Sequence, residues 1–422
     1  MAEIFKFGGA LLNDANGVKR MYQIISNYQK PPFVIVVSAL GKTTNALENI
    51  LFSLENNDVS KANFLLEQLK TKHFTIVDTL FDGMNKNSIF SMLDRCFDRL
   101  KNSLENLPDD IFRAYDTVVS FGERLATTVI GEYLRANGIK AKNIDSSAVI
   151  ITDSNFTSAG IDWDNTCKSV NENISPLLEK GYTVIVQGFT GADRQGRPTT
   201  LGREGSDFTA AVISKCLNVN ELTIWKDVPG FMNCDPKIFD DAVQLMNLSY
   251  HEAIELAFYG ASVVHPKTIQ PLQSSNIILK IRDFYDLKRE PTIISNSIAG
   301  DSTIPKIIVK KNQCLLSISS KTLSFIAEEN IKDIFDIFGK HKVHVNMMQN
   351  SAVSFSVCFD KNDEKLQMLL NSLSKLFTVK YNSGLTLYTI KNAGDKMFQH
   401  FTAGKTVYLL QESRNTLRFL VK

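Results

Sequence analysis

Two glycines follow a lysine where the first strand of the chain should end. In the run Lys6-Phe7-Gly8-Gly9 the glycines let backbone N–H groups approach an anion, and the lysine adds a positive charge suited to phosphate. Glycine pairs are also common in the turns that end strands. This motif by itself therefore indicates either a phosphate site or an ordinary turn.

A second loop of small residues, Ser38 to Thr44, follows the unbroken apolar run 33–37. The loop resembles a Walker A loop only in part, because Val36 stands where that motif needs a glycine five positions before Gly41. The apolar run predicts a strand buried on both faces. We expect the loop to lie at the carboxyl end of this parallel strand, where open α/β sheets bind ligands.

The segment Ser-Phe-Gly-Glu-Arg at 120–124 has two interpretations. Ser120 and Glu123 have the spacing of a capping box, which would make the segment only a helix start. Glu123 and Arg124 are adjacent, so on a helix they do not face each other. One of these two charged side chains is therefore expected to be available to a ligand.

The most informative segment is Thr-Thr-Leu-Gly-Arg-Glu-Gly-Ser-Asp at 199–207. Two glycines flank Arg203 just before a predicted helix, for which Ser206 is the expected N-cap. Backbone N–H groups at a helix N-terminus and an arginine fork together favour an anion site. A loop without a ligand is the alternative.

Acidic and basic residues alternate after another buried run, at 222–225. Lys226-Asp227 and Asp235-Pro236-Lys237 suit nucleotide phosphates and Mg²⁺ better than a sheet interior, although solvated turns have a similar composition. His341 and His344 have a spacing that suits a metal, but no third ligand is near them in the sequence. We therefore predict no metal site formed by protein side chains alone.

Hydrophobic patterning predicts how these motifs are positioned. Apolar runs at 33–37, 182–187 and 222–225, each after a helical stretch, predict an α/β domain with right-handed crossovers. Residues 47–115 predict several inserted amphipathic helices. Ser, Gly, Asp and Pro cluster at 296–305 and predict a linker, after which a βαββ rhythm occurs about twice.

Composition excludes several classes of protein. The 422 residues carry a formal charge of +2 with 44% hydrophobic residues, which is ordinary globular composition without the basic surface that nucleic acids or anionic membranes require. At about 150 residues per domain, the length predicts two or three folded units. No apolar run approaches the roughly 20 residues of a membrane span, and the N-terminus is not a signal peptide. Six scattered cysteines predict reduced thiols in a cytoplasmic protein.

Several motifs in one order closely resemble those of aspartate kinase in the amino-acid kinase family. They are KFGG, VSALGKTTN, FGERL, GFTGAD…TTLGREGSD, KDVPG…DPK and GASVVHPKT, and they span about residues 3–290. The tail resembles the paired ACT domains of that family. The resemblance implies a three-layer αβα sandwich with a mainly parallel sheet at 1–300, carrying the helical insertion at about 47–115. It further implies a linker at 301–305 and two intertwined ferredoxin-like α+β ACT modules at 306–422.

The resemblance also implies an activity, the phosphorylation of the L-aspartate side-chain carboxylate by MgATP for lysine, threonine and methionine synthesis. A carboxylate is already ionised at neutral pH, so this nucleophile needs no general base. The implied catalytic residues are Lys6 and Asp207. The implied aspartate pocket comprises Ser38, Thr44, Glu123 for the α-ammonium, Arg203 for the α-carboxylate, and Ser206; the implied nucleotide contacts are Gly8, Gly9, Lys226, Asp227, Met232 and Lys237.

The chain departs from the family pattern at several of these positions. Many relatives have Thr or Ser at Lys226, Tyr at Met232, Arg at Lys237 and Lys at Ser262. The charge missing at position 262 would have to come from Lys226 or Lys267. Segment 345–352 contains no acid, unlike lysine-inhibited relatives, so lysine is not predicted as the effector. Paired ACT modules nevertheless imply an amino-acid effector site and a homodimer, and Mg²⁺ is expected to be held mainly through the phosphates of ATP.

Two other functions stay open at this point. One is a kinase of the same superfamily acting on another acid, such as acetylglutamate or carbamate, but those enzymes lack an ACT tail and an ammonium partner like Glu123. The other is a catalytically inactive amino-acid sensor, and the presence of Lys6, Glu123, Arg203 and Asp207 argues against it.

Overall fold

The computed structural model describes residues 3–28, 33–261, 263–297, 303–322, 324–394 and 396–422. The chain divides into two compact units that interleave in sequence. The first unit contains residues 1–231, 244–257 and 262–301, and the second contains 232–243, 258–261 and 302–422. Part of the predicted linker at 301–305 lies outside the described residues, and the predicted domain boundaries stay predictions.

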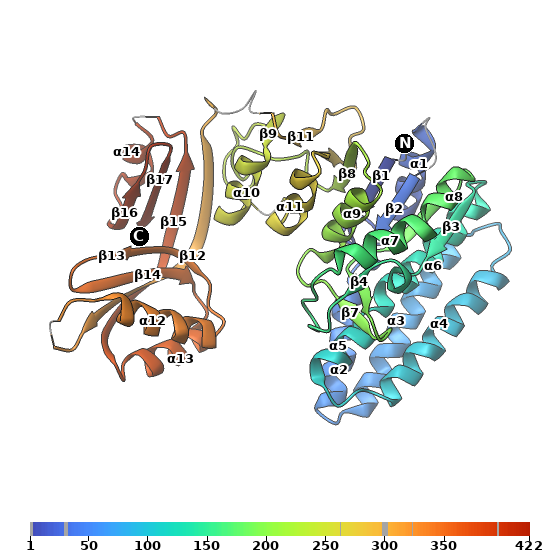
Figure 1. Cartoon of the computed structure of the whole chain (residues 1–422), viewed down its shortest axis with the longest axis horizontal. Helices are drawn as coiled ribbons and strands as arrows, with labels where there is room; N and C mark the ends of the chain where they lie inside the picture. The colour runs from blue at the N-terminus through green and yellow to red at the C-terminus, as the bar shows by residue number, and fades with distance from the viewer. Residues whose placement is uncertain (1–2, 29–32, 262, 298–302, 323, 395) are drawn as a thin grey trace. The chain divides into compact units, whose positions relative to one another are not determined.

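An eight-stranded, mainly parallel sheet forms the centre of the first unit (Figure 1). Its order is β3 (Ala141–Ile144), β5 (Thr183–Gln187), β2 (Phe33–Val37), β1 (Glu3–Phe7), β8 (Glu221–Lys226), β10 (Ile278–Asp283), β11 (Thr292–Ser295) and β9 (Asn247–Ser249). Only β10 and β11 pair antiparallel. The apolar runs found in the sequence form β2, β5 and β8, and every residue of β2 and β5 is buried.

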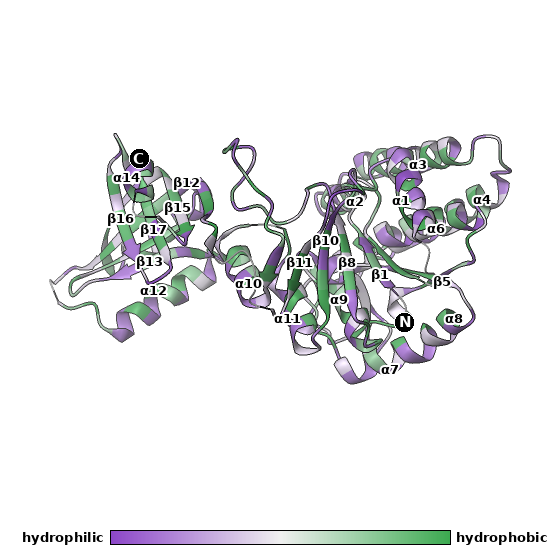
Figure 2. Ribbon diagram, turned by 90° about the horizontal axis from the view of Figure 1, so that it is seen from above, coloured by the Kyte–Doolittle hydropathy of each residue, from purple (hydrophilic) through white to green (hydrophobic). Residues whose placement is uncertain are grey.

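Helices cover both faces of this sheet, which is why its central strands are apolar throughout. Figure 2 shows α1, α3, α4 and α6 on one side and α7, α8 and α9 on the other, with hydrophobic residues concentrated in the strands between them. This arrangement confirms the predicted α/β class. The helices are α1 (Ala15–Asn27), α2 (Thr43–Glu55), α3 (Val59–Leu80), α4 (Asn87–Glu105), α5 (Ile111–Val119), α6 (Phe121–Ala136), α7 (Trp163–Asn173), α8 (Ser175–Glu179), α9 (Gly205–Cys216), α10 (Tyr250–Tyr259) and α11 (Pro266–Ser274).

A small second sheet lies beside the main one. It consists of β4 (Ile151–Thr152), β6 (Thr190–Asp193) and β7 (Pro198–Thr200), and a short 3₁₀ helix, η1 (Ser146–Ala148), precedes it. Strands β6 and β7 form a hairpin around Gly196, which has φ 75°. The hairpin leads the chain directly into the loop that contains Arg203.

The second unit is built on a six-stranded antiparallel sheet with helices, which confirms the predicted α+β class. The sheet order is β13 (Val345–Asn350), β14 (Ser354–Asp360), β12 (Lys306–Ser320), β15 (Phe377–Lys391), β17 (Thr416–Val421) and β16 (Val407–Glu412); the helices are α12 (Glu328–Lys340), α13 (Asp363–Leu373) and α14 (Met397–Thr402). Strand β12 has 15 residues and pairs with β15 along most of its length, across a bulge near Gln313.

The prediction of six reduced cysteines is wrong for one pair. Cys167 on α7 and Cys216 at the end of α9 form a disulfide, with their Cα atoms 4.6 Å apart. Because α7 packs against α9, thiols separated by 49 positions in sequence become neighbours. The remaining four cysteines are free thiols. Within the described part of the chain, none of the helices is long and apolar enough to cross a bilayer.

Candidate active site

A cavity of about 1000 Å³ lies in the first unit, at the carboxyl ends of β1, β2 and β8. Lys6 and Arg203, almost 200 positions apart in sequence, both line it. Eight of the residues singled out in the sequence line this cavity, namely Lys6, Ser38, Thr44, Glu123, Arg203, Ser206, Asp207 and Lys226.

Asp207 bridges two lysines inside the cavity. Its Oδ1 lies 2.5 Å from Lys6 Nζ, and its Oδ2 accepts a hydrogen bond of 2.9 Å from Lys226 Nζ. Burial alone would raise the pKa of Asp207, but the charges of the two lysines outweigh it and hold this pKa below its usual range. Burial by itself would lower the pKa of Lys226, but the charge of Asp207 outweighs it and raises this pKa. The carboxylate therefore keeps both ammonium groups in fixed positions.

Strand alternation explains how this cluster forms. Phe5 and Phe7 belong to the core beneath α1, α3, α4 and α6, so Lys6 between them lies on the opposite face of the sheet, toward α9. Strand β8 pairs in parallel with β1 and ends at Lys226, which places the two lysines side by side. Asp207 lies in the first turn of α9, where the helix dipole also favours a negative charge.

The predicted N-cap at Ser206 is wrong by two residues. Helix α9 begins at Gly205, and Glu204 occupies the N-cap position with a left-handed backbone, φ 53°. Ser206 instead packs against Gly188, where an added Cβ would lie 2.6 Å from the Ser206 Cβ. Gly188 is thus required to be glycine, and the close approach fixes the start of the helix.

Glu123 supplies a buried carboxylate with a vacant acceptor. It is 2% exposed, and its Oε1 accepts a hydrogen bond of 3.1 Å from the backbone N–H of Ala39. Its Oε2 has no hydrogen-bond partner among the described residues. Burial raises the pKa of Glu123 to about 8. The capping-box interpretation is wrong, because the hydroxyl of Ser120 donates to the carbonyl of Thr117 instead.

Arg124, the neighbour of Glu123, is already engaged. Its guanidinium forms an ion pair of 2.9 Å with Asp145. Of the two adjacent charges, Glu123 is therefore the one available to a ligand, as the sequence suggested for one of them. Arg203 is also available, because it is exposed and has no hydrogen bond or ion pair with any residue that the structure describes.

Comparison with known proteins identifies the family to which this site belongs. The family model for the amino acid kinase family matches residues 1–283. Aspartokinase 1 (chloroplastic) of Arabidopsis thaliana is 30% identical over 408 residues, covering 92% of this chain and 70% of that protein. The chain belongs to the aspartokinases of the amino acid kinase family.

Solved aspartokinase structures agree with this assignment. Aspartokinase III of E. coli in complex with lysine and aspartate (T-state) has a TM-score of 0.85 at 26% identity, covering all of this chain and 96% of that one. The same enzyme in complex with aspartate and ADP (R-state) has a TM-score of 0.83 at 27% identity, with equal coverage. The aspartokinase fold thus extends over both units of the chain.

The remaining residues assigned by the aspartokinase resemblance lie outside the cavity lining. Gly8 and Gly9 adjoin Lys6, and a Cβ added to Gly8 would lie 3.4 Å from Lys6 Nζ. Asp227 is exposed directly after Lys226. Met232 and Lys237 belong to the second unit. Their assignment to nucleotide binding stays a prediction.

Two lysines were candidates to replace the charge that aspartokinases often carry at position 262. Lys226 lines the cavity, whereas Lys267 donates to the Leu201 carbonyl at 3.0 Å and lies over the ring of Phe208. Ser262 itself lies outside the described residues. Lys226 is therefore the one of the two that faces the cavity.

Sequence reasoning missed Asp116, which holds the arginine loop of this aspartokinase in place. Its Oδ2 accepts hydrogen bonds of 2.9 Å from the backbone N–H groups of Thr157 and Thr200, and its Oδ1 accepts one of 2.7 Å from the Thr200 hydroxyl. Both threonines line the cavity. No sequence signal marks this residue, because a single aspartate on an amphipathic helix resembles any solvated position.

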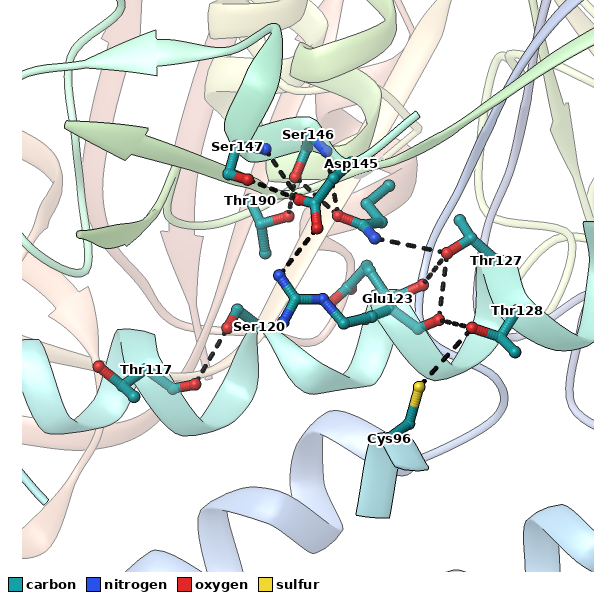
Figure 3. A network of polar contacts seen from close by, with 12 residues as sticks. Cys96, Thr117, Ser120, Glu123, Thr127, Thr128, Asp145, Ser146, Ser147 and Thr190 are labelled. Atoms are coloured by element: carbon teal, nitrogen blue, oxygen red, sulfur yellow. Dashed lines mark hydrogen bonds and ion pairs between the residues drawn. The ribbon is translucent and has the colours of Figure 1, made fainter. Parts of the chain in front are cut away.

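A hydrogen-bond network holds the helix of Glu123 against the sheet (Figure 3). The Thr127 hydroxyl donates to the Glu123 carbonyl at 3.1 Å and accepts from the Gln187 amide at 3.5 Å. The Gln187 oxygen accepts from the Ser146 hydroxyl at 3.0 Å, and Ser146 in turn contacts Thr190 at 2.6 Å. The network joins α6 to η1, β5 and β6, and so fixes the carboxylate of Glu123.

Proposed function

We propose that the protein phosphorylates the side-chain carboxylate of L-aspartate with MgATP, giving 4-phospho-L-aspartate and ADP. This reaction is the first step of lysine, threonine and methionine synthesis. The observation that carries the proposal is one cavity in which two lysines bridged by Asp207 face Glu123 and Arg203. The similarity to an aspartokinase in complex with aspartate and ADP supports it.

Aspartate binding uses the available charges of the cavity. The vacant Oε2 of Glu123 accepts the α-ammonium, which is the kind of partner that a buried orphan carboxylate oxygen requires. Arg203 binds the α-carboxylate with its bidentate fork. Ser38, Thr44 and Ser206 add neutral hydrogen bonds around the substrate.

Phosphoryl transfer then depends on position and charge rather than on proton transfer. The aspartate carboxylate is ionised at neutral pH and attacks the γ-phosphorus without a base, while the bond from that phosphorus to the β-phosphate oxygen breaks and ADP leaves. Lys6 and Lys226 neutralise the charge that spreads over the transferring oxygens, and Asp207 holds them in place so that no reorganisation is needed. Gly8, Gly9 and Asp227 contact the remainder of the nucleotide, and the role of Met232 and Lys237 stays a prediction.

Magnesium enters this scheme with the nucleotide. Among the described residues there is no group of three or more His, Cys, Asp or Glu side chains that would hold a metal. The phosphate oxygens would mainly hold the ion, which would neutralise part of their charge. The Glu204 carboxylate in the cavity, with its unpartnered Oε2, is the kind of oxygen ligand that this hard cation accepts.

Regulation and assembly are assigned to the second unit. We propose that it binds an amino-acid effector and forms a homodimer, as paired ACT modules do. A cavity of about 520 Å³ in this unit is lined by Glu412 and Arg418, opposite charges that suit a zwitterion. The cytoplasmic location stays a prediction.

The decisive experiment compares acceptors. ADP release from MgATP should require L-aspartate and should not occur with L-glutamate or N-acetylglutamate. Lys6→Met, which removes the ammonium, should lower kcat by roughly 10²- to 10³-fold. Turnover with N-acetylglutamate instead would favour the other kinases of the superfamily, and no turnover with any acid would favour the sensor.

A further inference from the structure

Glu204 lines the cavity, and the proposed reaction uses it only as an oxygen ligand for magnesium. Its backbone has φ 53° and ψ 28°, a left-handed conformation that costs free energy in any residue with a Cβ and that glycine adopts without strain. Its Oε2 is buried and has no hydrogen-bond partner within the described ranges. A strained backbone and an unsatisfied carboxylate together indicate a functional constraint at this residue.

The charge balance of the cluster formed by Lys6, Lys226 and Asp207 shows what Glu204 changes. Without it, two ammonium groups and Asp207 leave one net positive charge for a phosphate. Burial lowers the pKa of Lys6, and Glu204 is among the charges that oppose this shift; the same charge favours the protonated form of Lys226. With Glu204 ionised, the two ammonium groups and the two carboxylates have no net charge. The group then no longer attracts a metal-free polyphosphate by a net positive charge.

A divalent cation bound to the phosphates would restore the attraction between the nucleotide and this part of the cavity. It removes most of the repulsion between the phosphates and Glu204, and it offers the buried Oε2 the partner that the protein does not supply. A carboxylate oxygen is a preferred ligand of Mg²⁺, directly or through a bound water.

We propose that Glu204 is a specificity-determining residue that makes the site bind the magnesium complex of the nucleotide in preference to the metal-free nucleotide. This inference rests on the proposed function, because it assumes that the phosphates lie beside Lys6 and Lys226. It adds a role for this residue that the aspartokinase motif does not assign.

Calorimetric binding of ADP to the full chain tests the proposal without catalysis, once with excess Mg²⁺ and once with EDTA. The wild type should bind MgADP more tightly than free ADP. Glu204→Gln should bind free ADP roughly tenfold more tightly than the wild type does, because one nearby repulsive charge is gone. The affinity of Glu204→Gln for MgADP should rise little or fall. The ratio of the affinities for MgADP and free ADP should therefore decrease by at least about the same factor.

Two further variants make the result interpretable. Glu204→Gly removes the carboxylate and the backbone strain together, so folding is not at risk, and it should also lose the preference. Glu55→Gln, at the exposed end of α2 on the same cavity, removes an equal charge from another helix and should keep the preference of the wild type.

An unchanged ratio of the two affinities in both Glu204 variants would overturn the inference while nucleotide binding stands. So would a change of both affinities by one common factor, which is what a merely structural role produces. A wild type that binds the two forms equally would also overturn it. Absence of ADP binding in either condition would overturn the proposed function as well.

Discussion

Protonation of Glu123 should control how aspartate binds. Burial raises the pKa of this carboxyl to about 8, far above the usual range for glutamate, so in the free protein at pH 7 roughly nine molecules in ten carry the proton. An ammonium ligand requires the ionised form. Ionising Glu123 therefore costs about 1.4 kcal/mol at pH 7 and about 2.7 kcal/mol at pH 6, and nothing well above pH 8.

The sign of the pH effect follows from this cost. The free protein holds a proton that the complex with aspartate does not, so binding releases it and becomes tighter as the pH rises. The apparent affinity for aspartate should increase roughly tenfold per pH unit up to about pH 8 and then level off. Binding at pH 7 should release roughly 0.9 proton per aspartate.

Calorimetry in two buffers with different ionisation heats measures this proton directly. Glu123→Gln should bind aspartate with no proton release and with an affinity independent of pH between 6 and 8. An affinity of the wild type that does not change with pH, together with no proton release at pH 7, would show that Glu123 is not the partner of the ammonium.

Three further changes test other parts of the site and the fold. Arg203→Ala should raise the KM for aspartate by roughly 10- to 100-fold, with a smaller effect on the KM for ATP, because the α-carboxylate loses a bidentate partner. The matched control is Arg194→Ala, which removes an exposed arginine paired with Asp162. Equal steady-state kinetics of the two variants would refute the assignment of Arg203. Asp116→Asn should lower the free energy of unfolding by about 1–3 kcal/mol and raise the KM for aspartate, since an amide group cannot accept from all the donors around it. Denaturant unfolding measures the first effect, and a variant as stable as the wild type would refute the role of Asp116. Reduction with dithiothreitol should lower the free energy of unfolding of the wild type by up to about 4 kcal/mol, the chain-entropy value for a loop of 49 residues. The stability of Cys167→Ser should not change on reduction. Identical melting of the wild type with and without reductant would show that the two thiols are not linked.

Local patterns predicted much of the first unit. An apolar run such as 33–37 is a strand wherever it is buried on both faces, so β2, β5 and β8 were readable from the sequence. The helical stretch 47–115 was readable for the same reason, because its periodicity is internal to each segment. The length of β12 could not be predicted from the sequence, since pairing with β14 and β15 decides how far the strand continues.

The start of α9 shows where local reasoning fails. A serine before a helix is a good N-cap in isolation, but at Ser206 the backbone is fixed by contact with Gly188 on another segment. Two residues earlier, Glu204 has a left-handed backbone and an oxygen without a partner among the described residues, and no spacing rule indicates either feature.

The sequence by itself determined which chemical groups this aspartokinase possesses and which elements carry them, because residue type and periodicity are local properties. Only the tertiary structure decided which groups meet. Lys6 and Asp207 become an ion pair because strand alternation turns the lysine toward α9, and packing leaves one oxygen of the buried Glu123 without a partner among the described residues. Burial, which raises the pKa of Glu123, is likewise a property of the packed molecule, since it depends on every element that excludes water from the site.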